Sequence, residues 1–186
     1  MNKSLTKTSK FLSLVLRHRP EAIGLQLDSE GWLVIEELVD NANSRGETLT
    51  RQLIDEVVAT SDKKRFAISA DGQRIRASQG HSVAEVDLNL EPVEPPAILF
   101  HGTVAKFLES IRSQGLRKRT RNHVHLSPDQ LTAEKVGSRR GRPVILIIDA
   151  ESMNQSGIQF FRSANGVWLT DAVPARFITF PADGGA

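Results

Sequence analysis

An acidic, proline-containing segment divides this sequence into two parts with different patterns. Within residues 83–96, the acidic residues are Glu85, Asp87, Glu91 and Glu94, and the prolines are Pro92, Pro95 and Pro96. This composition is typical of a linker rather than of a helix or a buried strand. The chain has 186 residues, of which 39% are hydrophobic, and this is enough for two small cores. We therefore predict two lobes, residues 1–90 and residues 91–186.

The first part has the pattern of helices followed by a hairpin. Residues 4–17 place apolar side chains on one helical face, and Pro20 closes this helix. Residues 31–34 predict a short strand, residues 35–41 a helix, and residues 50–60 a further helix with Thr50 as its N-cap. The alternating runs 65–69 and 73–77 flank Asp71-Gly72, which is a hairpin signal. Helices followed by a two-stranded wing predict a winged-helix lobe.

The second part is predicted to be a strand-rich α+β domain. The short β-rich runs are residues 97–100, 124–126, 144–148, 167–170 and 177–180. One helical pattern covers residues 104–114. Between them, His101-Gly102-Thr103 is expected to form a turn at a strand end, where glycine lets a ligand approach the backbone and His101 and Thr103 offer hydrogen bonds.

The segment from Arg121 to Ser127 alternates as a half-buried strand would. Arg121, His123, His125 and Ser127 fall on one face, and Val124 and Leu126 fall on the other. A cation, two imidazoles and a hydroxyl in front of hydrocarbon would suit a pocket for an anionic ligand. The alternative is a solvent-exposed edge strand whose histidines have no function.

Positive charge is concentrated locally, although the net charge is only +2. Nine Lys and Arg residues lie between Arg112 and Arg142, against only Asp129 and Glu134. In the first part, guanidinium groups recur in the segments Arg17-His18-Arg19-Pro20, Lys64-Arg65-Phe66 and Arg74–Ser82. Guanidinium groups bind phosphate through forked hydrogen bonds, so both regions suit a phosphate-bearing partner. A merely solvated surface is the alternative.

Several other chemistries fit the sequence less well. The chain has no cysteine, so disulfides and thiolate chemistry are excluded and a reducing cytoplasm is expected. Residues 1–10 lack an apolar signal core, no apolar run reaches membrane-spanning length, and neither nucleotide-binding glycine motif occurs. A metal on His123 and His125 stays an open alternative. Covalent catalysis by Ser82 or Ser127 is not expected, because neither lies in a nucleophile-elbow context.

Six segments occur in the order found in one known family. They are Leu16-Arg17-His18-x-Pro20, Lys64-Arg65-Phe66, Arg76-Ala77-x-Gln79-Gly80-His81-Ser82, His101-Gly102-Thr103, Arg121-x-His123-Val124-His125-Leu126-Ser127 and Gly141-Arg142-Pro143. Together they resemble the RNA 2′-phosphotransferase family, the NAD-dependent tRNA 2′-phosphotransferases, over nearly the whole chain. The resemblance implies a winged-helix lobe, which would bind the RNA phosphate, joined to an ADP-ribosyltransferase-like lobe, which would bind NAD⁺.

The resemblance also implies a reaction. Members of this family remove an internal 2′-phosphate from RNA, as some ligases leave at a splice junction, and transfer it to NAD⁺. The products are 2′-OH RNA, nicotinamide and ADP-ribose 1″,2″-cyclic phosphate, formed through an ADP-ribosylated 2′-phosphate. No metal is implied. Two alternatives stay open: ADP-ribosyl capping of terminal phosphates on RNA or DNA, and a non-catalytic winged-helix protein that binds RNA.

Residue roles follow from the motif match alone. Catalysis is implied for Arg17, His18, Arg65 and Arg121, with His18 as the proton handler; Arg119 is a competing choice for Arg121. NAD⁺ contacts are implied for His101, Gly102, Thr103, His123, His125, Ser127 and Arg142. Contacts with RNA or its phosphate are implied for Arg76, Gln79, His81 and Ser82. Val167 stands where many ADP-ribosyltransferases carry a glutamate, which argues against ordinary protein ADP-ribosylation.

Overall fold

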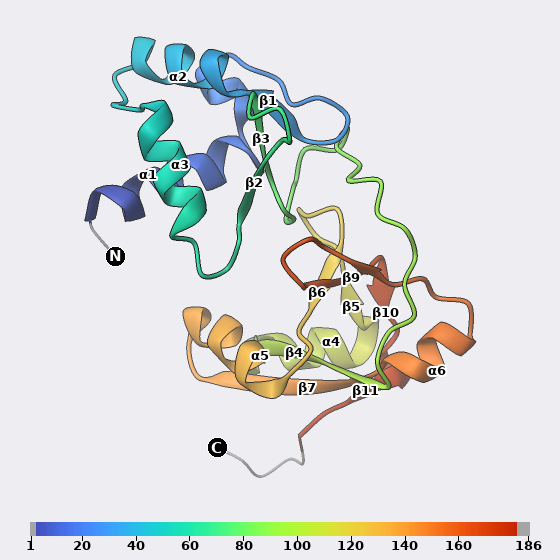
Figure 1. The fold of residues 1–186 in the computed structure, drawn as a ribbon. Coiled ribbons are helices and arrows are strands. Elements are labelled where there is room, and N and C mark those ends of the chain that lie inside the picture. The colour runs from blue at the N-terminus through green and yellow to red at the C-terminus, as the bar shows by residue number, and fades with distance from the viewer. Residues whose placement is uncertain (1–2, 182–186) are drawn as a thin grey trace. The chain divides into compact units, whose positions relative to one another are not determined.

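The computed structural model describes residues 3–181, which form helices and small antiparallel sheets (Figure 1). By its internal contacts the chain divides into two units, of which the first ends at Asn89 and the second begins at Leu90. Each unit has its own core of buried apolar side chains. The mixed helix and strand content confirms the α+β class at that level.

The first unit packs three helices against a three-stranded sheet. Its helices are α1 (Lys3–Val15), α2 (Ile35–Ser44) and α3 (Arg51–Ala59), and its strands are β1 (Trp32–Val34), β2 (Phe66–Ile68) and β3 (Arg74–Ala77). The sheet is antiparallel, in the order β1-β3-β2. Leu12, Leu16, Leu38, Ile54 and Ile75 are completely buried in the core between helices and sheet.

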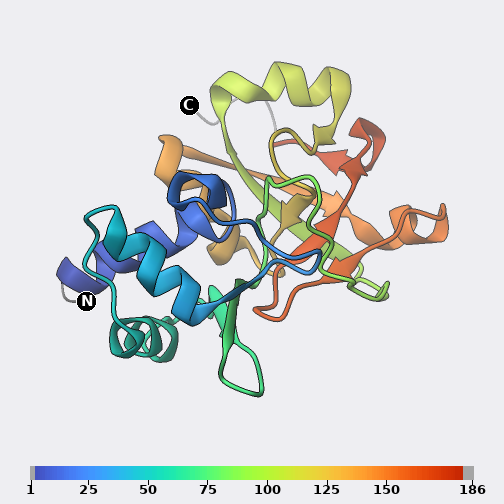
Figure 2. The ribbon, with the colours of Figure 1, turned by 90° about the horizontal axis from the view of Figure 1, so that it is seen from above.

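Local signals explain two of these elements. The predicted cap Thr50 is confirmed, because its side chain accepts a hydrogen bond from the Leu53 amide at 3.2 Å. Asp71 accepts one from the Gln73 amide at 2.9 Å, and Gly72 adopts a φ of 73°, so the turn between β2 and β3 is the one that the Asp-Gly pair predicts. The tip of the β2–β3 hairpin extends beyond the three helices of its unit (Figure 2).

The second unit contains three small antiparallel sheets and three α-helices among the described residues. Its strands are β4 (Ile98–Val104), β5 (Leu116–Arg117), β6 (Val124–Leu126), β7 (Pro143–Asp149), β8 (Phe161–Arg162), β9 (Trp168–Thr170), β10 (Ala172–Val173) and β11 (Ile178–Thr179). The sheet orders are β11-β7-β4, β6-β9-β8 and β10-β5. The helices are α4 (Leu108–Gln114), α5 (Gln130–Gly137) and α6 (Ala150–Gln155). Leu99, Leu126, Leu146 and Phe160 are buried at its core.

The predicted turn at His101-Gly102-Thr103 is wrong, because β4 continues through all three residues to Val104. They pair with Leu146, Ile145 and Val144 of β7. The helix predicted from Val104 begins as α4 only at Leu108, after a short 3₁₀ turn. Gly102 has a packing role in the strand: α5 lies so close that a Cβ at residue 102 would be 1.9 Å from the Ala133 carbonyl oxygen.

Gly102→Ala should therefore destabilise the second unit. The added methyl group meets backbone atoms of α5, which cannot rotate away, so we expect a loss of roughly 1–3 kcal/mol or more in unfolding free energy. Urea unfolding monitored by circular dichroism measures this change. Ile98→Thr, at an exposed position of the same strand, is the control and should change stability by less than about 0.5 kcal/mol. Equal stability of wild-type and Gly102→Ala protein would contradict the packing role.

The strand predicted from Arg121 to Ser127 is also shorter than expected. Only Val124–Leu126 forms β6, paired with β9, and Ser127 adds an isolated bridge to Phe100. Residues 118–123 connect β5 to β6, and residues 119–123 of this connection form bends. The partner strand β9 ends at Thr170 and the next strand, β10, pairs with β5 instead. The residues just before Val124 therefore pair with no strand. The alternation of side chains between two faces, predicted for Arg121 and His123, does not occur there.

Candidate functional site

Each unit carries its own polar cluster, and the first lies where α1 meets the hairpin. The backbone continues from α1 into a turn at residues 16–18, which places Arg17 and His18 just beyond the helix. The Ser82 amide donates to the Arg17 carbonyl at 2.8 Å. This bond ties the segment after β3 to the end of α1. We call Arg17, His18, Arg65, Arg76, His81 and Ser82 the first-unit cluster.

The Arg17 side chain is held by the hairpin backbone at Arg65. The Arg17 guanidinium donates to the Arg65 carbonyl at 3.4 Å and lies 6.0 Å from the centre of the Phe66 ring. The Ser78 amide donates to the same Arg65 carbonyl at 2.9 Å. Both arginines are half-buried. The Arg17 guanidinium is thus held beside the backbone of Arg65, and two arginines this close together favour an anionic ligand.

His18 is exposed and bonded to Ser82. Its Nδ1 lies 2.9 Å from the Ser82 hydroxyl oxygen, and that oxygen lies 3.5 Å from the Arg17 carbonyl oxygen. The structure therefore brings the predicted proton handler His18 together with Ser82, which the motif match had assigned to RNA. Gln79 lies half-buried in the same segment, three residues before Ser82.

His81 is buried, with only 2% of its surface exposed. A Cβ at Gly31 would lie 3.0 Å from its Nε2, so the ring packs beneath the turn that precedes β1. Burial, together with the positive charges of Arg17, His18 and Arg76, lowers the pKa of His81 to about 4. The ring is therefore neutral at physiological pH, and it supports the first-unit cluster by its packing in the interior. Arg76 lies 4.4 Å above the Trp32 ring and donates to the Glu30 carbonyl at 3.4 Å.

The buried His81 should make the first unit sensitive to acid. Above pH 6.5 its ring is neutral in both folded and unfolded chains, whereas between pH 6.5 and about 4 only the unfolded chain binds a proton there. This difference should lower the unfolding free energy by about 2 kcal/mol between pH 7.5 and pH 5. Urea unfolding of wild-type and His81→Gln protein at both pH values measures it. An identical loss in the two proteins would show that His81 does not cause the sensitivity.

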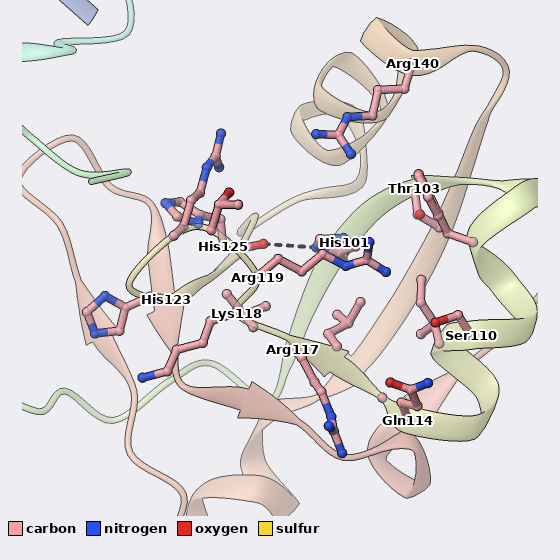
Figure 3. Close-up of a pocket in the computed structure, with 17 residues that line it drawn as sticks. His101, Thr103, Ser110, Gln114, Arg117, Lys118, Arg119, His123, His125 and Arg140 are labelled. Carbon is pink, nitrogen blue, oxygen red and sulfur yellow. Dashed lines mark hydrogen bonds between the residues drawn. The ribbon is translucent and has the colours of Figure 1, made fainter. Parts of the chain in front are cut away.

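The second cluster surrounds a cavity of about 490 Å³ within the second unit (Figure 3). Its walls come from β4, α4, β5, the 118–123 segment, β6 and the helical turn at residues 138–140. The polar and charged lining residues are His101, Thr103, Ser110, Gln114, Arg117, Lys118, Arg119, Thr120, Arg121, His123, His125 and Arg140. None of the described residues that line this cavity is acidic. We call it the cationic cavity.

His101 has a defined tautomer at the cationic cavity. Its Nδ1 lies 3.0 Å from the His125 carbonyl oxygen. A carbonyl only accepts, so Nδ1 carries the proton and the lone pair of the neutral ring is on Nε2. Burial is the main cause that lowers the pKa of His101, and Arg140 acts in the same direction, against the effect of the hydrogen bond to His125. His101 can therefore accept a hydrogen bond through Nε2.

The cations of the cavity repel one another. The surrounding protein desolvates the Arg121 guanidinium and lowers its pKa, and repulsion from Arg140 and Arg139 adds to this effect. Arg121 nevertheless stays protonated at neutral pH, since its side chain is exposed to water and arginine deprotonates only at high pH. Of the other cations, Lys118 pairs with Asp171 at 3.1 Å, and Arg119 lies 5.7 Å from the Phe107 ring centre. An anion bound in the cavity would relieve the repulsion.

The structure brings together some of the predicted site residues of the second unit, the catalytic candidate Arg121 among them, and separates others. His101, Thr103, Arg121, His123 and His125 line the cationic cavity. His123 lies apart from His101 in Figure 3, with its ring edge-on to Phe161 at 5.8 Å between ring centres. Three further predicted residues are not among those that line the cavity: Gly102, Ser127 and Arg142. Gly102 packs against α5, the Ser127 backbone exchanges hydrogen bonds with Phe100, and Arg142 is exposed just before β7.

Sequence reasoning gave no site role to several residues that line the cavity, among them Ser110, Gln114 and Arg140. Ser110 and Gln114 lie side by side on α4 in Figure 3, because residues four apart share one helix face. That spacing was visible in the predicted helix. Arg140 was visible only as one member of a cationic run; its position on a helical turn after α5 could not be read from the sequence, because α5 was not predicted.

Residues 3–181 lack two other kinds of feature. Within that range no group of three or more His, Cys, Asp or Glu side chains is arranged to hold a metal ion. No helix in the same range combines the length and the apolar character needed to cross a bilayer.

Comparison with known proteins gives one consistent result. Residues 3–172 match the family model described as "RNA 2'-phosphotransferase, Tpt1 / KptA family". A protein of Rhodopirellula baltica named "Probable RNA 2'-phosphotransferase" is 63% identical over 180 residues, which cover 97% of this chain and 98% of that protein. Proteins with the same name from Agrobacterium fabrum and Streptomyces coelicolor are 56% and 57% identical, and the aligned regions cover at least 95% of each chain.

Proposed function

The chain belongs to the RNA 2′-phosphotransferase family, and from this premise we propose that it transfers the internal 2′-phosphate of RNA to NAD⁺. Membership makes it a transferase that removes 2′-phosphate from RNA. The NAD⁺ co-substrate, the ADP-ribosylated 2′-phosphate intermediate and the residue roles are parts of the proposal. Its products are 2′-OH RNA, nicotinamide and ADP-ribose 1″,2″-cyclic phosphate.

The cationic cavity is the observation that carries the NAD⁺ proposal. Five cations, Arg117, Lys118, Arg119, Arg121 and Arg140, line it, and no acidic side chain of the described residues does. NAD⁺ contains an anionic pyrophosphate, which such a field would attract. The volume of about 490 Å³ lies in the usual range of ligand pockets, roughly 300–1,000 Å³. Ser110, Gln114, Thr103 and Nε2 of His101 add hydrogen-bonding groups suited to ribose hydroxyls and adenine.

The first-unit cluster supports the RNA part of the proposal. The Arg17 guanidinium donates to the backbone carbonyl of Arg65, and Arg76 stacks on Trp32 in the same unit. We assign Arg17 and Arg65 to the 2′-phosphate, which carries about two negative charges near neutral pH. Arg76 and Gln79 are assigned to the flanking RNA. The buried His81 supports these groups instead of contacting RNA directly.

In the first step, an oxygen of the RNA 2′-phosphate attacks C1″ of the nicotinamide ribose. The C1″–N bond breaks, and its electron pair leaves with nicotinamide and neutralises the pyridinium charge. Because the phosphate is already an anion, no general base is needed. The protein must hold two anionic substrates in line and offset their repulsion, a task for Arg17, Arg65 and Arg121.

In the second step, the 2″-hydroxyl oxygen of the same ribose attacks the phosphorus. The bond between phosphorus and the RNA 2′-oxygen breaks, which closes the 1″,2″-cyclic phosphate. One proton leaves the 2″-hydroxyl and one is taken up by the departing RNA oxygen, so proton transfer is required. We assign this transfer to His18, the exposed imidazole of the first-unit cluster.

We propose the matching fold assignments for the two units, residues 1–90 and 91–186. The order α1, β1, α2, α3, β2, β3 with an antiparallel sheet supports a winged helix in the first unit. The strand-rich second unit with its cationic cavity supports an ADP-ribosyltransferase-like lobe. In that lobe Ser127 and Arg142 keep a proposed NAD⁺ role, whereas Gly102 is explained by helix packing.

Incubation with NAD⁺ and an oligonucleotide that carries one internal 2′-phosphate tests the proposal. We expect NAD⁺-dependent conversion to the 2′-OH oligonucleotide, and mass spectrometry of the RNA measures this conversion. A stable ADP-ribosylated end on a 5′- or 3′-phosphorylated oligonucleotide, with the internal phosphate untouched, would support capping of terminal phosphates instead. Binding without turnover at high enzyme concentration would contradict the proposal and favour a non-catalytic RNA-binding protein.

A further inference from the structure

Ser82 lies where it can control the protonation of His18. The Ser82 amide bonds to the Arg17 carbonyl at 2.8 Å, and its hydroxyl oxygen lies 2.9 Å from His18 Nδ1. On the helix side, the His18 amide donates to the Leu14 carbonyl at 3.0 Å. The backbone of both residues is therefore held, and the contact between their side chains follows from this arrangement.

The third group in this contact offers an acceptor for the Ser82 hydroxyl proton. The Ser82 hydroxyl lies 3.5 Å from the Arg17 carbonyl oxygen, which accepts hydrogen bonds and never donates them. A hydroxyl has one proton and can also accept. If that proton goes to the carbonyl, the hydroxyl oxygen must accept from His18, and Nδ1 carries the imidazole proton. A chain then runs from His18 Nδ1–H to the Ser82 hydroxyl and on to the Arg17 carbonyl.

This order of bonds suits a histidine that both gives and takes a proton. Nδ1 keeps its proton in the neutral ring and in the cation, so neither Ser82 nor Arg17 has to move when the charge changes. The exchangeable proton is then on Nε2. In the opposite order, the Ser82 hydroxyl would donate to Nδ1, and the bond would break whenever the ring became charged.

We propose that Ser82 is a positioning residue, whose hydroxyl, held by the Arg17 carbonyl, keeps the His18 proton on Nδ1 and leaves Nε2 to exchange the proton of the transfer reaction. This inference rests on the proposed function for the role of His18, but the tautomer is a property of the protein without substrates. It also changes the role of Ser82 from a contact with RNA to a contact with the catalytic histidine.

Nitrogen-15 NMR of histidine-labelled protein without substrates tests the tautomer directly. His18→Gln identifies the His18 signals among the five histidines. At a pH where the ring is neutral, we expect the proton on Nδ1 of His18 in wild-type protein and a shift toward the Nε2–H form in Ser82→Ala. A proton on Nε2 of His18 in the wild-type protein would overturn the proposal, whatever the variants do.

Kinetics of three variants complete the test. Ser82→Ala should slow cyclic-phosphate formation on the order of 10- to 100-fold and leave nicotinamide release unchanged, because a misplaced group affects only the step it serves. Ser82→Thr keeps the hydroxyl and should restore most of that rate. Ser44→Ala removes an exposed serine hydroxyl that bonds a backbone carbonyl at 2.9 Å, and it should change neither step.

The outcomes separate this proposal from the proposed function. An Nδ1–H tautomer that depends on Ser82, in a protein without NAD⁺-dependent turnover, would support the positioning and reject the function. Turnover with equal rates of cyclic-phosphate formation in wild-type and Ser82→Ala protein would reject the positioning and leave the function standing. In the His18→Ala background, Ser82→Ala should have no additional effect, because the two residues act through one imidazole.

Discussion

Arg121→Ala is expected to abolish the reaction of NAD⁺ with 2′-phosphorylated RNA, with a loss on the order of 10³-fold or more in nicotinamide release. Its guanidinium lies at the cationic cavity, where desolvation, together with repulsion from Arg140 and Arg139, lowers its pKa. A group so placed gains most from a bound anion. The effect is measured as the rate of nicotinamide release at saturating concentrations of NAD⁺ and RNA, with nicotinamide detected by chromatography. Arg121→Lys keeps the positive charge but loses the paired N–H donors of the guanidinium group, so it should recover only part of the rate.

Matched variants show whether the effect is specific to Arg121. Arg162→Ala removes an exposed guanidinium of the same unit that lies over Trp168, and it should leave nicotinamide release unchanged. Ile148→Val truncates a completely buried side chain that does not line the cavity, and it should cost roughly 0.5–1.5 kcal/mol of stability while the remaining folded protein stays active. Arg119 also lines the cavity. Loss of the reaction in Arg119→Ala but not in Arg121→Ala would assign the catalytic role to Arg119.

His18→Ala is expected to separate the two chemical steps. The first step needs no general base, whereas the second moves two protons, so loss of the imidazole should slow the second step on the order of 10²- to 10⁴-fold. ADP-ribosylated RNA should then accumulate and be visible by mass spectrometry of the oligonucleotide. Arg19→Ala is the control, because Arg19 is the next residue, is exposed and pairs with Glu21. Persistence of unmodified RNA in His18→Ala would show that His18 acts in the first step.

The elements that the sequence predicted well are those with local signals. Thr50 caps α3, and Asp71-Gly72 closes the β2–β3 hairpin, because both signals act within three residues. The sequence also indicated the segments that form each polar cluster. It did not indicate that Ser82 contacts His18, since these residues are 64 positions apart and only the path of the chain after β3 joins them.

Two helices of the second unit were missed for a physical reason. α5 turns the small residues Ala133 and Gly137 toward the sheet and leaves Leu131 and Val136 exposed, at 68% and 43%. This reverses the pattern that predicts an amphipathic helix, because Gly102 and Gly137 allow the helix to approach β4 closely. α6 has only six residues, too few for a periodic pattern, although Asp149 caps it by accepting from the Ser152 amide.

The wrong predictions around the site also have tertiary causes. Gly102 looked like a turn residue, yet it is a strand residue that accommodates a helix. Arg121 and His123 looked like members of a strand, yet they lie in a bend because β9 ends at Thr170 and provides no partner for them. They still line the cationic cavity with His125. The residues of the site could therefore be predicted, but the local structure that positions them could not.

The small-molecule product tests the central claim most directly. The wild-type protein is incubated with NAD⁺ and an oligonucleotide whose single internal 2′-phosphate carries ³²P, and the released label is analysed by chromatography and mass spectrometry. The account predicts that the label appears in ADP-ribose 1″,2″-cyclic phosphate, in equal amount to nicotinamide, and only when NAD⁺ is present. Release of the label as inorganic phosphate, at the same rate with and without NAD⁺, would contradict it.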